Sequence, residues 1–326
     1  MPPDDHAATP ISGQPLTADE CLAQTSPFRA TDHAGVEWGT LALLIATYAV
    51  LGVGTTWATA LSPLLGVVLT GLAIAQFCSL QHEVLHGHPF RSRVLNEALV
   101  FPGFALTVPY GRFRDTHLAH HYDPVLTDPY DDPESNYLDP AVWNRLPWLS
   151  QTILRCNNTL MGRIVIGPLV GNVLWLRAEA KLLLAGNRAV MRDWGLHLAG
   201  VALVVVWITA VPMSGWAYLA AVWIGHALLK IRTFLEHRAH ALARARTVII
   251  EDRGPLAFLF LNNNLHVVHH CHPEVPWYRL PALYRGNRDH YLRRNEGYAY
   301  RNYAEVFRKH LLRAKDPVPH PLWPQP

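Results

Sequence analysis

Residues 265–270 read Leu-His-Val-Val-His-His, and the same spacing of three histidines occurs earlier in residues 117–121, His-Leu-Ala-His-His. Histidine is concentrated around these two stretches. Of the 19 histidines in the chain, 12 lie in residues 82–121 and 237–272. We therefore expect the remainder of the chain to act as a scaffold that brings these two windows together.

The histidine spacing has a physical reason. Positions i, i+3 and i+4 of a helix share one face, so each His-x-x-His-His stretch can direct three rings at one place. A neutral imidazole offers one lone pair to a metal, and one zinc ion takes about four ligands. Nine or more candidate imidazoles are too many for one such ion, so we infer two metal ions, of a kind that spacing alone does not name. The ligands predicted by spacing are His82, His86, His117, His120, His121, His266, His269 and His270.

Two long stretches of the chain carry no charged residue. Half of the residues are hydrophobic (50%), the mean hydropathy is +0.07, and residues 38–81 and 194–229 contain no Asp, Glu, Lys or Arg. At about 20 residues per crossing, each stretch is long enough for two membrane-spanning helices and an uncharged turn. We expect an all-α integral membrane protein with four transmembrane helices in two hairpins, at residues 38–57, 64–81, 194–211 and 216–234.

Basic residues follow each expected hairpin. Arg91 and Arg93 come after the second helix, and Lys230 and Arg232 end the fourth. Because the cytoplasmic ends of membrane helices carry an excess of Lys and Arg, we expect the turns outside and the histidines in a cytosolic helical cap.

The ends of the chain differ in composition from its middle. Residues 1–36 are polar and rich in proline, without the basic segment and apolar core of a signal peptide. We expect a polar N-terminal tail at 1–36, a membrane domain at 37–290 and a C-terminal cytosolic tail at 291–326. The four cysteines show no pair spacing, which favours reduced thiols, with Cys271 a small filler rather than a ligand.

An acidic, proline-rich stretch, Asp-Pro-Tyr-Asp-Asp-Pro-Glu, follows the second histidine group at residues 128–134. Its composition predicts a loop. A carboxylate of this loop could reach a metal, but the favoured interpretation is a solvated loop that pairs with nearby arginines.

The histidine groups at 82–86, 117–121 and 266–270, in this order around two hairpins, resemble those of the membrane-bound fatty acid desaturase superfamily. The resemblance covers about residues 38–290. It implies that His237, after the last helix, is a ninth ligand. It also implies two non-haem iron ions, O2 as oxidant, a fatty acyl lipid or similar apolar chain as substrate, and an electron donor such as ferredoxin or rubredoxin. The site would face the cytosol from a bacterial inner membrane, with no nucleic-acid partner.

Related activities stay open within that superfamily. Hydroxylases and ketolases share the same histidine pattern. The wording His-Glu-Val-Leu-His-Gly-His-Pro at 82–89 is similar to a bacterial subgroup that includes a desaturase of the dihydrorhizobitoxine type, so a small non-lipid metabolite is an alternative substrate.

Two interpretations lie outside the superfamily. His82-Glu83-x-x-His86 is also the pattern of zinc proteases, with Glu83 as general base. That reading needs a further carboxylate ligand, which the membrane stretches lack, and it uses neither His-x-x-His-His group. A non-enzymatic metal-binding or transport protein would be expected to carry intramembrane polar residues, and only His197 and His226 qualify.

Other polar residues lie close to the expected ligands. Metal-bound histidines usually donate their second ring nitrogen to an acceptor. Asn262 and Asn263 could accept such a bond or cap a helix. The main candidates for contacts around the ligands are Glu83, His88, Glu236, His240, Asn264 and His272.

Overall fold

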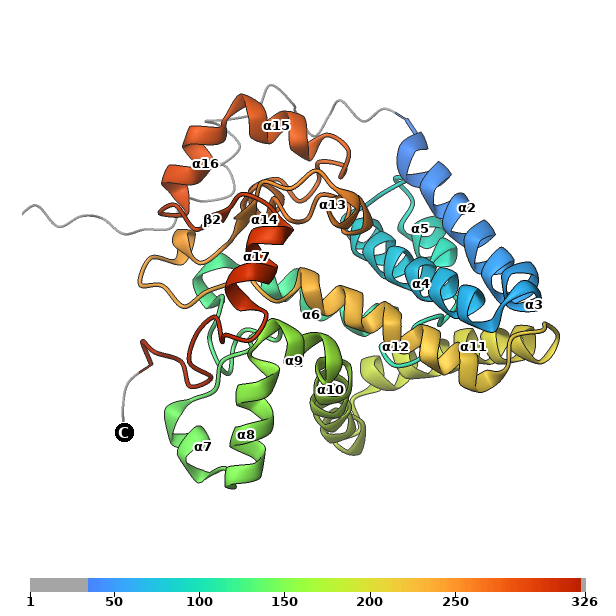
Figure 1. Cartoon of the computed structure of the whole chain (residues 1–326), viewed down its shortest axis with the longest axis horizontal. Helices are drawn as coiled ribbons and strands as arrows, with labels where there is room; N and C mark the ends of the chain where they lie inside the picture. The colour runs from blue at the N-terminus through green and yellow to red at the C-terminus, as the bar shows by residue number, and fades with distance from the viewer. Residues whose placement is uncertain (1–34, 324–326) are drawn as a thin grey trace, which may run out of the picture.

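The computed structural model describes residues 35–323 and is predominantly helical. Figure 1 shows α2 (Trp38–Val53), α4 (Pro63–Leu85), α11 (Arg188–Thr209) and α12 (Gly215–Arg232) gathered toward one end of the molecule. The segments after α12 lie toward the other end. The expected tail at residues 1–36 falls almost wholly outside the described residues.

The chain changes direction at Ser62, between α3 (Thr59–Leu61) and α4. A π-helical turn, η2 (Gly54–Ala58), and then α3 continue α2 to this point. The Ser62 side chain then accepts a hydrogen bond from the Leu65 backbone N–H, and Pro63 occupies the first turn of α4. Serine at the cap and proline in the first turn both favour the start of a helix.

Helices α4 and α12 pack closely because each has a glycine at the contact. A Cβ atom on Gly71 would lie 2.8 Å from the Ile224 side chain, and one on Gly225 would lie 2.7 Å from Ile74. This packing fixes the two helices against each other. Their C-terminal ends lead to the first histidine pair and to His237.

Three stretches among the described residues are long and apolar enough to cross a membrane: Trp38–Leu61, Pro63–Leu85 and Arg188–Thr209. Helix α12, the fourth expected span, is not one of them. It has 18 residues and ends in Lys230 and Arg232. Helix α11 begins earlier than charge alone predicted, because the Asn187 side chain caps it by accepting from the Ala189 and Val190 N–H groups.

Helices of 5 to 18 residues make up most of the remaining described chain. Before α11 these are α5 (Arg93–Leu99), α6 (Tyr110–His120), α7 (Pro140–Arg145), α8 (Trp148–Asn157), α9 (Leu160–Val165) and α10 (Gly167–Leu184). After α12 they are α13 (Pro255–Leu259), α14 (His266–Cys271), α15 (Leu280–Gly286), α16 (Arg288–Arg294) and α17 (Tyr303–His310). Two strands of two residues, β1 (Ile249–Ile250) and β2 (Ala299–Tyr300), pair in parallel. The all-α expectation missed this pair, since two residues carry no periodicity.

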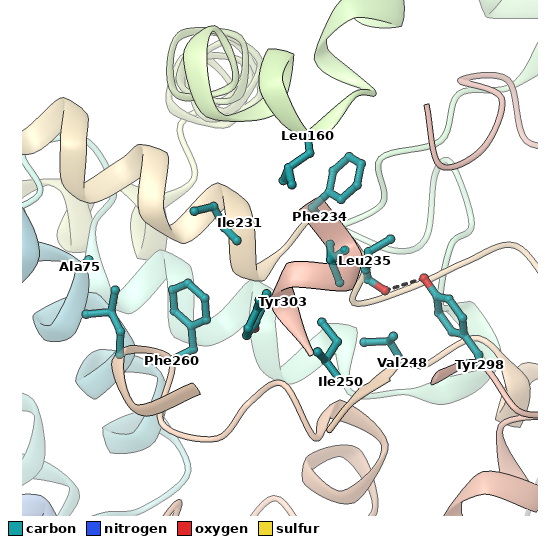
Figure 2. Packing of buried hydrophobic residues seen from close by; sticks show 12 residues of the cluster. Ala75, Leu160, Ile231, Phe234, Leu235, Val248, Ile250, Phe260, Tyr298 and Tyr303 are labelled. Atoms are coloured by element: carbon teal, nitrogen blue, oxygen red, sulfur yellow. Dashed lines mark hydrogen bonds between the residues drawn. The ribbon is translucent and has the colours of Figure 1, made fainter. Parts of the chain in front are cut away.

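A hydrophobic cluster joins α4 and α12 to the later segments (Figure 2). Ala75 of α4, Ile231 of α12 and Leu160 of α9 pack in one core with Tyr298 and Tyr303. The Tyr298 hydroxyl donates to the Leu235 carbonyl oxygen at 2.7 Å. Residues beyond 290 therefore contribute to the same core as the two long helices.

Cysteine pairing differs from the expectation of reduced thiols. Cys78 and Cys156 are free, but Cys271 is disulfide-bonded. That expectation is wrong for Cys271, because a disulfide depends on distance in the folded chain rather than on spacing in the sequence.

Candidate metal centre

The structure gathers all nine predicted histidines into two groups. Within each group the possible ligand atoms lie within 4.8 Å of one another. The first group contains His82, His86, His117, His121 and His269, and the second contains His120, His237, His266 and His270. Each group of imidazoles could hold a metal ion.

Each His-x-x-His-His stretch is divided between the two groups. His117 and His121 belong to the first group, whereas His120 belongs to the second. The second stretch is divided in the opposite sense, with His266 and His270 in the second group and His269 in the first. The expectation that three rings of one stretch point at one place is therefore wrong. Positions i and i+4 differ by about 40° around a helix, but i+3 and i+4 differ by about 100°.

The ring nitrogens approach one another closely inside both groups. His121 Nε2 lies 2.9 Å from His117 Nε2 and 3.2 Å from His269 Nε2. In the second group, His237 Nε2 lies 2.8 Å from His120 Nε2 and 3.1 Å from His266 Nε2. Two nitrogens bound at right angles to one ion, each at about 2.1 Å, would lie about 3.0 Å apart. The spacing therefore suits shared metal ligation.

Carboxylates fix the orientation of two of these rings. His117 Nδ1 lies 2.9 Å from Glu134 Oε1, and His120 Nδ1 lies 2.7 Å from Asp132 Oδ1. A carboxylate only accepts, so each Nδ1 carries a proton and each Nε2 faces its group. Two imidazole lone pairs 2.9 Å apart repel unless a proton or a metal cation lies between them. A metal would displace that proton, as metal binding to histidine generally does.

The acidic loop at residues 128–134 differs from the solvated loop that the sequence predicted. Asp132 is buried, and its second oxygen accepts a hydrogen bond from the Thr127 N–H at 2.8 Å. Asp132 and Glu134 bind imidazole rings instead of arginines, so the expected solvated loop is wrong for these two residues. The need of metal-bound histidines for an acceptor could have pointed to them.

A third ring is held by an amide. His266 Nδ1 lies 3.0 Å from Asn263 Oδ1, and Asn263 Nδ2 donates to Glu236 Oε1 at 3.2 Å. Glu236 also accepts from Arg232 at 2.9 Å. Of the candidates for contacts around the ligands, Glu236 is thus placed beside a group, and Asn263 occupies the role considered for Asn264.

The other candidates make different contacts. Glu83 accepts from the Trp277 N–H at 3.0 Å and lies 3.9 Å from His88 Nε2. Asn264 donates to the carbonyl oxygens of Ile250 and Asp252. His240 accepts from the Leu242 N–H, and His272 contacts the Tyr291 hydroxyl at 2.9 Å. Neither metal group found among the described residues includes His88, His240 or His272.

Burial favours the neutral form of several ligand rings. It lowers the pKa of His121, His237, His266 and His269 below the ordinary histidine value, and neighbouring imidazoles lower it further. His120 is the exception. Burial opposes its charged form, but Glu134 and Asp132 outweigh this and raise its pKa to about 9. A set of mostly neutral imidazoles is suited to ligate metal at neutral pH.

The fold and site define a helical protein with candidate membrane spans and two largely buried histidine groups suited to metal. The sequence model of the fatty acid desaturase family matches residues 55–302, and the chain belongs to this family. The family implies an oxidoreductase that carries out desaturation or a related oxidation. A search of curated proteins found no match.

Proposed function

We propose that this protein is a membrane diiron enzyme that uses O2 to desaturate an apolar carbon chain. The observation that carries the proposal is the division of nine imidazoles into groups of five and four, each compact enough for one ion. The first group would hold one iron and the second group the other. The family match supports iron and oxidative chemistry.

The bound irons would supply the oxidising power to remove hydrogen from an unactivated C–H bond. The residues of the protein orient the metal ligands and shield the metal positions from water. Asp132 and Glu134 hold the rings of His120 and His117 through Nδ1, which leaves Nε2 directed at the metal positions. Burial of the ligands keeps bulk water away, and the adjoining pocket would position the substrate.

The protease alternative is disfavoured by the position of Glu83. A general base must reach the water on the metal, but the Glu83 carboxylate accepts the Trp277 backbone N–H. The nine histidines also exceed what a single zinc site uses.

The proposal includes a membrane arrangement. Helix α12 would be the fourth span beside the three candidate stretches, completing two hairpins, and residues 37–290 would form the membrane domain. Lys230 and Arg232 would mark the cytosolic side. The centre would then face the cytosol from a bacterial inner membrane and receive electrons from a separate protein such as ferredoxin or rubredoxin.

The test is expression with a ferredoxin-type donor and mass spectrometry of lipids and small metabolites. Desaturation predicts a product two hydrogens lighter than its precursor, and a His117→Ala variant should lose it. A product one oxygen heavier would assign the chain to the hydroxylases. One tightly bound zinc ion and no iron in the purified protein would contradict the proposal.

A further inference from the structure

A pocket of about 310 Å³ adjoins the second histidine group. Glu134, Glu236 and His237 line it on the side of the metal centre. Helices α10 and α12 contribute Asn172 and Lys230, among other residues. Since His237 belongs to the second group, a molecule in this pocket would lie at the edge of the metal centre.

The volume of the pocket gives the scale of what lies inside it. An engineered cavity of about 150 Å³ binds benzene, which has six carbon atoms. A pocket of about 310 Å³ would by proportion hold about a dozen non-hydrogen atoms. The pocket is partly open, so a longer molecule would extend beyond it.

The pocket wall is mainly apolar, with Phe113, Trp175 and Leu229 among its residues, and polar groups are gathered at a few places in it. Asn172 Nδ2 lies 3.2 Å from His226 Nδ1, and Asn172 Oδ1 accepts from the Thr107 hydroxyl at 3.2 Å. His226 lies on α12 one turn before Lys230, farther from His237 along the chain. These polar groups are hydrogen-bonded to one another, so an apolar chain beside them leaves none of these groups unpaired.

Lys230 is a cation in the pocket wall without a counter-ion. Among the described residues, no carboxylate lies within 4.0 Å of its ammonium group and no hydrogen bond to it is formed. Nearby carboxylates are engaged elsewhere. Glu236 pairs with Arg232 at 2.9 Å, and Glu134 binds His117.

Two other basic residues, Lys315 and Arg163, lie near this site. Lys315 also lines the pocket, but it donates to the His237 carbonyl oxygen and lies 3.9 Å from Asp316. Arg163 is 4% exposed and donates to Asn136 Oδ1 at 2.6 Å, and no carboxylate of the described chain lies within 4.0 Å of it. Arg163 and Lys230 both pack around Gly167. Charges removed from water in this way are stabilised by an anion.

We propose that Lys230 binds the free carboxylate of an organic acid and holds its carbon chain toward the metal centre. The inference rests on the proposed oxidative function and specifies its substrate class. One ammonium group suits a singly charged carboxylate, whereas a phosphate dianion usually takes several donors. An acid esterified to a carrier or lipid would present no charge to Lys230.

The experiment compares octanoate with methyl octanoate as probes. Binding is measured by calorimetry on the full-length, iron-loaded protein in lipid nanodiscs, with empty nanodiscs as the blank. The variants are Lys230→Met, which removes the charge, and Lys230→Arg, which keeps it. Lys181→Met is the matched control, because Lys181 is an exposed lysine in the last turn of another helix, α10.

The native protein should bind octanoate more tightly than the ester. Lys230→Met should weaken octanoate binding by about tenfold to a hundredfold, the usual effect of losing a hydrogen bond to a charged group, and leave ester binding unchanged. Lys230→Arg and Lys181→Met should keep the preference for the acid. Iron content and melting temperature, measured on each variant, exclude misfolding as the cause.

Equal binding of acid and ester by the native protein would overturn the inference, as would unchanged octanoate binding in Lys230→Met. The proposed function fails by a separate result, namely absence of iron or of any oxidised product. Turnover of a neutral ester by an iron-loaded protein would keep the proposed function and reject the free-acid substrate.

Discussion

His120 Nδ1 and Asp132 Oδ1 lie 2.7 Å apart, and both side chains are buried. The pair joins the end of α6 to the acidic loop, so one hydrogen bond fixes both the tautomer of the ring and the position of the loop. The carboxylate also accepts the Thr127 N–H, which leaves it little freedom to turn away. The orientation of His120 therefore depends on a residue that is not itself expected to touch metal.

Replacing Asp132 should accordingly weaken metal binding. Loss of such a partner typically lowers metal affinity by 10- to 100-fold, so Asp132→Asn should retain less iron after dialysis against a chelator. Asp131→Asn is the control, because Asp131 is the adjacent, exposed carboxylate. Equal iron retention in the two variants would show that the contact to His120 does not support the metal.

Replacing His120 or His121, which are adjacent in the sequence, should remove different metal ions. His120→Ala removes a ring from the group of four, and His121→Ala removes one from the group of five. Each variant should lose about one iron per chain, and Mössbauer spectra should show that the remaining site differs between them. His240→Ala should keep both ions, because His240 lies outside the groups. Identical residual spectra from the first two variants would contradict the division.

The sequence predicted which histidines gather, but not how they divide between the two groups. Periodicity identifies a face of a helix, and both histidine stretches are helical, one at the end of α6 and the other in α14. The ring at position i+3 points about 100° away from the ring at i+4 around the helix. Whether it joins the same metal group depends on the ligands that other segments place on either side. The same limit explains why Asp132 and Glu134 were missed. Their loop folds inward only because buried imidazoles need acceptors there.

The helical architecture was easier to predict than its boundaries. Two uncharged stretches located the long helices, because composition alone separates them from the rest. Charge was a poor guide to the ends of α11 and α12, since Arg188, Lys230 and Arg232 all belong to helices. The pairing of β1 with β2 joins segments about 50 residues apart, which no local pattern records.

Acid should destabilise the metal-free protein. Burial lowers the pKa of His121, His237, His266 and His269, so these rings stay neutral in the fold. The unfolded chain takes up protons below about pH 6.5, so stability should fall as the pH falls through and below that value. His120 affects stability in the opposite direction. Its pKa is raised to about 9, so its contribution to stability is lost as the pH rises.

The four lowered rings should outweigh His120. The melting temperature of metal-free protein, measured from pH 8 to pH 5, should therefore decrease toward the acid end. Iron-loaded protein should also release its metal over this range, because protons compete for the ligand nitrogens. A melting temperature that rises on acidification would show that the buried rings do not stay neutral.

The two ends of the helical bundle should differ in accessibility from outside the cell. Leu61 and Trp216 are exposed beside the turns at Ser62 and Ser214, and Leu312 is exposed beyond α17. In a background without the exposed Cys156, single cysteines at Leu61 and Trp216 should react with an impermeant maleimide in intact cells. A cysteine at Leu312 should react only after lysis, because the basic helix ends are expected inside. Labelling of Leu312→Cys in intact cells would reverse the proposed orientation.

The contact between α4 and α12 should be intolerant of a single methyl group. A Cβ on Gly71 would lie 2.8 Å from Ile224 Cβ and 3.0 Å from the Ala221 carbonyl oxygen, so Gly71→Ala must push the helices apart. Overpacking of this kind costs about 1–3 kcal/mol. Because α4 carries His82 and α12 leads to His237, the variant should lose iron as well as melt at a lower temperature. Gly52→Ala is the matched control, since its Cβ would meet no atom within 4 Å. If Gly71→Ala retained its iron while melting earlier, the helix contact would support stability without positioning the ligands.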